Sequence, residues 1–260
     1  MLAMLTSALA ERIADLQKGD LQTVEVAVLD SGIDATHPDL AGKVSKAFAA
    51  YVVGGTAVVE PKGVPENHDV FGHGTAVASI ICGIAKNARL IDYRVLGSDN
   101  TGAGEAVLSS LRDAIDAGHR VINMSLAVKA DFAPRLWPLC EKAYRRGQVI
   151  VAAKRNMPLA DQGFPAELTS VISVDRAKFA SAVSLKYTPD SVIEFVGHGD
   201  DVVVAAPGGQ HTTKTGTSFA TPAVSGMVAV LLGAFPSLRP FDVKSVLRHW
   251  ADTIEAEVIP

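Results

Sequence analysis

The sequence contains few of the residues that mark disulfide-stabilised, nucleic-acid-binding or membrane-spanning proteins. Its 260 residues include only two cysteines, and 24 lysines and arginines stand against 28 aspartates and glutamates, for a formal net charge of −4. The charge does not indicate a basic surface for nucleic acid. No run of consecutive apolar residues approaches the ~20 residues that span a bilayer. Although aromatic residues make up only 6%, hydrophobic residues make up 48%, enough for a sizeable core.

The two cysteines, Cys82 and Cys140, do not form a CxxC motif. Both lie in apolar stretches with helical spacing, which favours buried free thiols. A disulfide or a redox switch is the alternative interpretation.

Residues 2–17 predict an amphipathic helix that ends at Gly19. Its apolar stripe consists of Leu2, Leu5, Leu9, Ile13 and Leu16. We expect this stripe to pack on the body of the protein, with docking of a partner chain as the alternative. The stretch has no basic start and is interrupted early by charge, so it is not typical of a secretory signal. We therefore divide the chain into an N-terminal helix (1–20) and one domain (21–260).

Beyond this helix, strand-like and helix-like segments alternate. The apolar run at 24–29 is typical of a strand buried on both faces. Such alternation predicts an α/β fold: a single-domain, doubly wound, mostly parallel sheet with helices on both faces. The stretch 45–70, rich in Gly, Pro and Val, is expected to be an irregular surface excursion. Expected helices are 74–85, 104–117, 132–146, 218–234 and 239–252; expected strands are 24–29, 89–95, 120–125, one starting at 148, 170–174, 192–196 and 202–205.

Three residues whose side chains could take part in catalysis lie at the ends of these elements. Asp30 directly follows the apolar strand, His73 opens a helix of small residues, and Ser218 follows a glycine-bearing turn at the start of another helix. A serine hydroxyl needs a base to take its proton, and a histidine base needs a carboxylate to orient it. The free N–H groups at a helix start also favour negative charge, as a tetrahedral oxyanion requires.

The segments around these residues read VAVLDSGIDATHPDL, FGHGTAVAS and GTSFATPAVSG. They resemble the signatures of the subtilisin-like serine proteases (subtilase family, peptidase S8), in which the chain order is also Asp, His, Ser. The resemblance implies the subtilisin-like fold and a serine endopeptidase that acts through an acyl-enzyme. Where the family usually has a second histidine in two of these motifs, this chain has Ala76 and Ala223.

The resemblance also implies a side-chain donor for the oxyanion. After the strand at 149–153, Asn156 is the candidate; the alternative is an ordinary loop asparagine. The family usually has a glycine immediately before this asparagine, whereas this chain has Arg155. If that position requires an unusual backbone conformation, Arg155 would be strained.

Substrate-binding residues follow from the same resemblance, because the family binds an extended peptide as an added strand. Where the family commonly has two glycines, this chain has Ala127 and Val128. If either side chain points into the pocket for the residue before the cleaved bond, that pocket accepts small or medium apolar residues best. The candidate substrate-binding residues are Asn100, Gly102, Ser125, Leu126, Ala127 and Thr217.

Neither a metal nor a cofactor is expected. Asp34, His37 and Asp39 lie close in sequence but lack paired ligand spacing. Many secreted members of the family insert a calcium-binding loop into the helix after the catalytic histidine. Here that helix connects directly to the next strand, which leaves no room for such a loop.

Other interpretations stay open at this point. An α/β-hydrolase elbow would need GxSxG, but Ala220 stands at the last position and the chain order differs. A catalytically inactive binding module and a serine esterase or acyl-transferase remain. Secreted members usually carry a signal peptide and a pro-domain, and neither fits before Asp30. We therefore expect an intracellular or processing protease that acts on proteins or peptides; a secreted protein that has lost its leader is the alternative.

Overall fold

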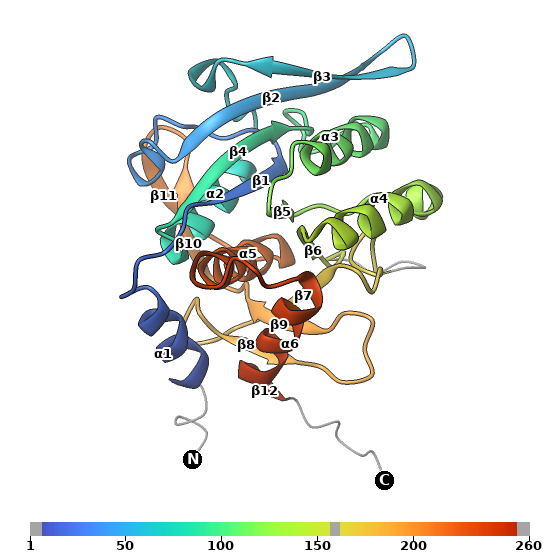
Figure 1. Ribbon diagram of the computed structural model, residues 1–260. Helices are drawn as coiled ribbons and strands as arrows, with labels where there is room; N and C mark the ends of the chain where they lie inside the picture. The colour runs from blue at the N-terminus through green and yellow to red at the C-terminus, as the bar shows by residue number, and fades with distance from the viewer. Residues whose placement is uncertain (1–6, 157–161, 254–260) are drawn as a thin grey trace.

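A ten-stranded, mostly parallel sheet runs through the protein, with helices on both of its faces (Figure 1). The computed structural model describes residues 7–156 and 162–253. The strand order is β12-β8-β9-β7-β6-β5-β1-β4-β2-β3, in which β2–β3 and β8–β9 are the antiparallel neighbours. The predicted doubly wound α/β fold is confirmed.

The strands of the large sheet are β1 (Val24–Asp30), β2 (Val44–Val53), β3 (Thr56–Lys62), β4 (Ala88–Arg94), β5 (Val121–Met124), β6 (Val149–Ala153), β7 (Ile172–Ala177), β8 (Leu185–Tyr187), β9 (Phe195–His198) and β12 (Asp252–Thr253). A separate antiparallel pair consists of β10 (Val202–Ala206) and β11 (Gln210–Lys214). The helices are α1 (Ser7–Leu16), α2 (His73–Ile84), α3 (Gly104–Asp116), α4 (Ala133–Arg146), α5 (Thr217–Ala234) and α6 (Pro240–Trp250).

The central strand β1 contributes side chains to two hydrophobic cores. Because side chains alternate along a strand, Val26 and Val28 face one core, whereas Ala27 and Leu29 face the other. The first core is built mainly with α2 and α5, and the second with α3 and α4. This double burial explains why β1 has a continuous apolar run.

Helix α5 fills the centre of the first core. It has 18 residues and a mean hydropathy of 1.5, which is long and apolar enough to cross a bilayer, but 89% of it is buried inside the protein. Its composition is therefore explained by its position as a core helix.

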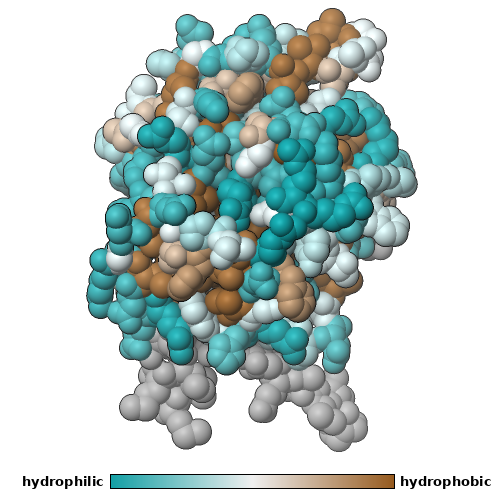
Figure 2. Space-filling model, in the orientation of Figure 1, coloured by the Kyte–Doolittle hydropathy of each residue, from teal (hydrophilic) through white to brown (hydrophobic). Residues whose placement is uncertain are grey.

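The expectation of an irregular excursion at 45–70 is wrong for most of that stretch. Strands β2 and β3 form an antiparallel hairpin, and Gly54 and Gly55 turn it with φ of 56° and 81°. Gly-Gly between two strands is a known hairpin signal, because this tight turn requires positive φ at both positions. The proline in β3 is tolerated because β3 is an edge strand. Val52 and Val53 are exposed at the hairpin's apolar tip (Figure 2).

Both cysteines are free and buried, which confirms the prediction of buried thiols. They lie in different cores, Cys82 on α2 and Cys140 on α4. Burial raises the pKa of the Cys82 thiol to about 11 and that of Cys140 to about 12. Such thiols are poor nucleophiles at neutral pH.

Helix α1 packs on the body of the domain. Leu9 and Ile13 are buried in the first core, and α1 contacts α5. The guanidinium of Arg12 lies 5.4 Å from the ring centre of Trp250. The described part of the predicted apolar stripe is thus covered by this chain itself, while Leu2 and Leu5 lie outside the described residues.

We expect Ile13→Ala to lower the free energy of unfolding by about 2–5 kcal/mol, because it removes a fully buried side chain. Chemical denaturation measures the loss. Glu11→Ala, on the exposed side of the same helix, is the control and should change stability little. Equal effects of the two substitutions would contradict a structural role for the buried side of α1.

Candidate functional site

The predicted site residues converge at the carboxyl edge of the sheet. Asp30 ends β1, Ser125 follows β5, and Asn156 follows β6, while His73 and Ser218 lie in the first turns of α2 and α5. Strand β1 is flanked by β4 on one side and by β5 on the other, so the chain reverses its winding direction there. Open α/β sheets bind their ligands at such a crevice.

Asp30 and His73 form a direct contact. His73 Nδ1 lies 2.7 Å from Asp30 Oδ1, and the Ser31 N–H donates to the same oxygen at 2.8 Å. A carboxylate only accepts, so it favours the tautomer in which Nδ1 carries the proton and Nε2 accepts one. Burial lowers the pKa of His73, but the charge and hydrogen bond of Asp30 together with the charge of Asp69 raise it, and the net direction is upward.

Asp69 organises the approach of α2 and was not among the residues selected from the sequence. Its carboxylate accepts hydrogen bonds from the Ser31 hydroxyl, from the backbone of Phe71 and Gly72, and from both N–H and hydroxyl of Thr75. The carboxylate thus caps the start of the helix and links it to the turn after Asp30. An aspartate shortly before a helix start is a recognisable capping signal.

A second acidic residue, Asp92, lies behind this turn. It is fully buried, and burial raises its pKa well above the ordinary value. Its Oδ2 accepts from Asn67 Nδ2 at 2.6 Å and from the Ile33 N–H at 3.1 Å. Asp92 therefore ties together the segments that follow Asp30 and precede His73.

The close approach of α2 to β1 depends on Gly74. A Cβ at this position would lie 2.1 Å from the Gly32 carbonyl oxygen and 3.2 Å from the Asp30 Cβ. The Gly74 N–H instead donates to the Ser31 hydroxyl at 3.0 Å. Residue 74 must therefore be glycine for His73 to reach Asp30.

Ser218 is oriented by the neighbouring strand end. Its hydroxyl donates to the Ser125 carbonyl at 3.0 Å. Asn123 links the same region to α5, because its Nδ2 donates to the Ser125 hydroxyl and its Oδ1 accepts from Ser225. The rings of His73 and Phe219, the residue after Ser218, lie 5.5 Å apart. Rotation of the hydroxyl toward His73 is the change that proton transfer requires, since catalytic hydrogen bonds are often not aligned before substrate binds.

The Asn156 amide has a defined orientation. Its Oδ1 accepts from the Thr217 N–H at 3.0 Å, whereas the Thr217 hydroxyl, 3.2 Å from the same oxygen, donates to the Lys154 carbonyl at 2.7 Å. Because a backbone N–H can only donate, the amide oxygen faces Thr217 and the NH₂ group remains available to donate elsewhere. Arg155 is not among the residues with positive φ, so the backbone strain considered for this position is absent.

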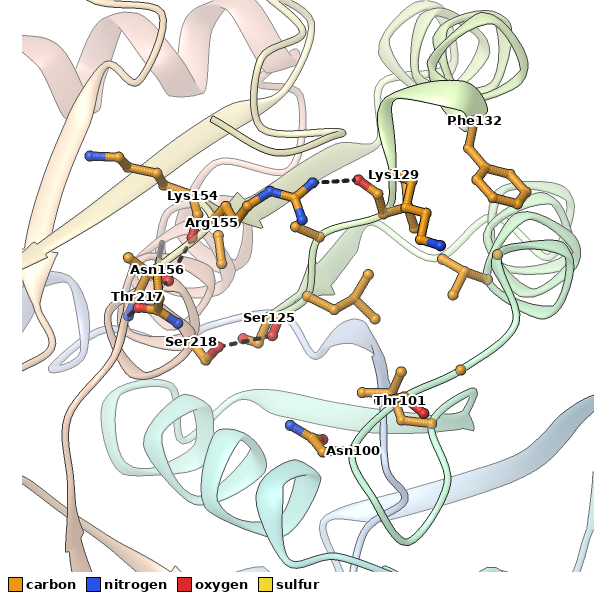
Figure 3. Close-up of a pocket in the computed structure, with 18 of the residues that line it drawn as sticks. Asn100, Thr101, Ser125, Lys129, Phe132, Lys154, Arg155, Asn156, Thr217 and Ser218 are labelled. Atoms are coloured by element: carbon orange, nitrogen blue, oxygen red, sulfur yellow. Dashed lines mark hydrogen bonds between the residues drawn. The ribbon is translucent and has the colours of Figure 1, made fainter. Parts of the chain in front are cut away.

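A cavity of about 860 Å³ adjoins Ser218. Ser218, Thr217 and Asn156 lie at one end, and Phe132 lies toward the other (Figure 3). All six candidate substrate-binding residues line this cavity, namely Asn100, Gly102, Ser125, Leu126, Ala127 and Thr217. Eight of the ten residues selected from the sequence therefore line this cavity. The other two, Asp30 and His73, pair with each other, and His73 contacts Phe219 next to Ser218.

One group of potential metal ligands lies away from this cavity. His37 and Asp39 meet His211, with ligand atoms within 4.8 Å of one another, whereas Asp34 accepts from Thr36 in a local turn. Both ring nitrogens of His37 are already used, by the Gln210 carbonyl and the Asp39 N–H, and Asp39 Oδ2 lies 2.8 Å from His211 Nε2. These contacts explain the group as a hydrogen-bond network without an ion.

The chain is similar to known proteins of one family. The profile of the family described as "Subtilase family" matches residues 22–258. Subtilisin DY of Bacillus licheniformis is 32% identical over 89% of this chain and 84% of its own length. The major intracellular serine protease of Bacillus subtilis (strain 168) is 30% identical over 81% of this chain and 68% of its own length.

A solved structure of a subtilisin-like protein has a similar fold. The crystal structure of a cold adapted subtilisin-like serine proteinase superimposes with a TM-score of 0.71 over 88% of this chain and 82% of that chain, at 24% identity.

Gly74→Ala should lower the free energy of unfolding by about 1–3 kcal/mol, because the added methyl overlaps the Gly32 carbonyl oxygen. It should also reduce any activity that needs the Asp30–His73 contact by about 10²-fold, since a displacement of ~1 Å is enough for such a loss. Denaturant melts and turnover assays measure both effects.

Gly83→Ala is the matched control on the same helix. Its Cβ would have nothing within 4 Å, and helix propensity predicts unchanged or slightly higher stability, by up to about 1 kcal/mol. If Gly74→Ala behaved like this control, the close approach at Gly32 would not constrain the site.

Proposed function

The chain belongs to the subtilase family and is a serine endopeptidase, and from this premise we propose that Ser218, His73 and Asp30 form its catalytic triad. The proposed reaction is hydrolysis of peptide bonds within protein or peptide substrates, through an acyl-enzyme on Ser218. The observation that carries the proposal is the 2.7 Å contact between His73 Nδ1 and the buried Asp30 carboxylate. This contact prepares Nε2 to accept a proton at the edge of the sheet where Ser218 lies.

The proposed mechanism assigns one task to each group. Ser218 Oγ attacks the scissile carbonyl carbon while its proton passes to His73 Nε2. Asp30 keeps the imidazole in position and stabilises the imidazolium. The C–N bond then breaks, and the proton on Nε2 goes to the leaving amine. Water, deprotonated by the same histidine, hydrolyses the acyl-enzyme and regenerates the serine.

Two donors are proposed for the oxyanion. The Ser218 backbone N–H lies in the first turn of α5, where such groups have no partner within the helix. The Asn156 NH₂ group is the second donor, because the contacts with Thr217 engage the amide oxygen. Hydrogen-bond donors fixed before the reaction stabilise developing charge without reorganisation.

Substrate is proposed to bind in an extended conformation between two segments, 100–102 and 125–127. Both segments line the cavity beside Ser218. Backbone hydrogen bonds to an added strand would supply affinity, and the cavity would accept side chains.

We further propose that the protein acts inside the cell, which is supported by a similar relative that is named an intracellular serine protease.

A fluorophosphonate probe tests the proposed nucleophile. We expect it to label Ser218 in the full chain and to label neither Ser218→Ala nor a heat-denatured sample. Labelling together with cleavage of unfolded casein would support the peptidase. Folded protein that neither labels nor cleaves would instead be an inactive binding module, and labelling with ester turnover alone would favour an esterase or acyl-transferase.

Asn156→Ala should lower kcat by about 10²–10³-fold, with KM changed much less, because one oxyanion donor is lost. Thermal melting should show that the protein still folds, and the fluorophosphonate should still reach Ser218. A loss in kcat of less than about threefold would remove Asn156 from the mechanism.

The rate should depend on pH through His73, which acts as a base only when neutral. Because the pKa of His73 is raised, kcat/KM should be low at acid pH and rise with a midpoint above the ordinary value of 6.5. Asp30→Asn should lower kcat by about 10⁴-fold, since the favoured tautomer is lost. A pH–rate profile of the wild-type protein with a midpoint well below 6.5 would contradict the proposed role of Asp30.

A further inference from the structure

The cavity beside Ser218 lies on the acyl side of the bond to be cleaved, if the proposed function holds. The leaving amine takes its proton from His73 and must therefore depart on the side of Ser218 where His73 lies. His73 is not among the residues that line the cavity, whereas Ser218 and Asn156 are. The side chain of the residue whose carbonyl is attacked therefore enters the cavity. This residue is called the acyl residue below.

Two strand ends form the walls of the cavity near Ser218. Residues 125–128 follow β5, and residues 153–156 end and follow β6. The Arg155 side chain extends from the second wall to the first (Figure 3). Its Nη2 donates to the Val128 carbonyl at 3.0 Å, so a long side chain spans the gap between the walls.

A third segment, residues 162–163, packs against both walls. A Cβ placed on Gly163 would lie 3.0 Å from the Ala127 Cβ and 3.1 Å from the Arg155 Cβ. The Arg155 N–H also donates to the Gln162 carbonyl at 2.7 Å. Residues 127, 155 and 163 are therefore in tight contact, with no space for a large ring between them.

Val128 contributes less to this narrowing than its volume suggests. It is only 7% exposed, belongs to the second hydrophobic core, and pairs with Phe164 through its backbone. The Val128 carbonyl, and not its branched side chain, accepts the hydrogen bond from Arg155. The bulk that limits the depth of the cavity near Ser218 thus comes from Arg155 and the Ala127 methyl.

We propose that Arg155 is a specificity-determining residue, which closes the acyl-residue pocket so that small side chains such as Ala and Ser are accepted and large aromatic ones are excluded. The reason is volume, since the side chain and its hydrogen bond to Val128 occupy the space that an aromatic ring needs. The interior is close-packed, so even single methylene groups change the fit.

Peptide substrates that differ only in the acyl residue test this proposal. We measure kcat/KM for Phe and for Ala at that position and compare their ratio within each variant, so that changes in overall activity cancel. The wild-type ratio should be well below one. Arg155→Gly should raise it by about 10–200-fold, the range expected for relief of a small steric mismatch.

Arg155→Gln is the matched variant, because it keeps a long side chain with a donor group but removes the charge. Its Phe/Ala ratio should stay within about threefold of the wild-type value. A rise equal to that of Arg155→Gly would overturn volume as the cause, and a wild-type ratio above one would overturn the proposal itself. Because Arg155→Gln retains bulk, it keeps the comparison interpretable if the glycine variant folds poorly.

Failure of the proposed function has a different signature. If the fluorophosphonate does not label Ser218 and no peptide is cleaved, the catalytic proposal fails. If labelling and cleavage occur but the Phe substrate is preferred, only the role of Arg155 is wrong.

Discussion

The whole site depends on one short contact between a buried carboxylate and a histidine at the start of a helix. Burying Asp30 costs free energy unless hydrogen bonds replace its hydration. The Ser31 N–H and His73 Nδ1 supply two such bonds. They form because glycine at 74 lets α2 approach the end of β1, and because Asp69 fixes the helix start against the same turn. Helix α2 in turn packs on α5, which presents Ser218.

Much of the fold and the main candidate residues could be predicted from the sequence. The continuous apolar run before Asp30 indicated a strand buried on both faces, and its alternate residues do serve two cores. The three motifs carried enough information to select Asp30, His73 and Ser218, because chemistry of this kind needs particular residue types at particular element ends. Small residues in the helix after His73 indicated its close packing.

The remaining features depend on contacts between segments that are distant in sequence. The β2–β3 hairpin was missed because Gly and Pro were taken as signs of irregular structure, although here they mark a tight turn and an edge strand. Asn123 was not selected because its importance comes from Ser125 and Ser225, which only the folded chain brings to it. The path of Arg155 across the cavity likewise depends on a rotamer and on Gly163.

The order of the proposed catalytic groups along the chain has a consequence for biosynthesis. Asp30 and His73 lie in the first third of the sequence, whereas Ser218 stands on α5, which is also the central helix of the first core. While the chain grows on a ribosome, the nucleophile emerges last, and the core that holds the other groups in place is completed by the same helix. On the proposed assignment, a nascent chain therefore gains its nucleophile only together with the helix that completes this core.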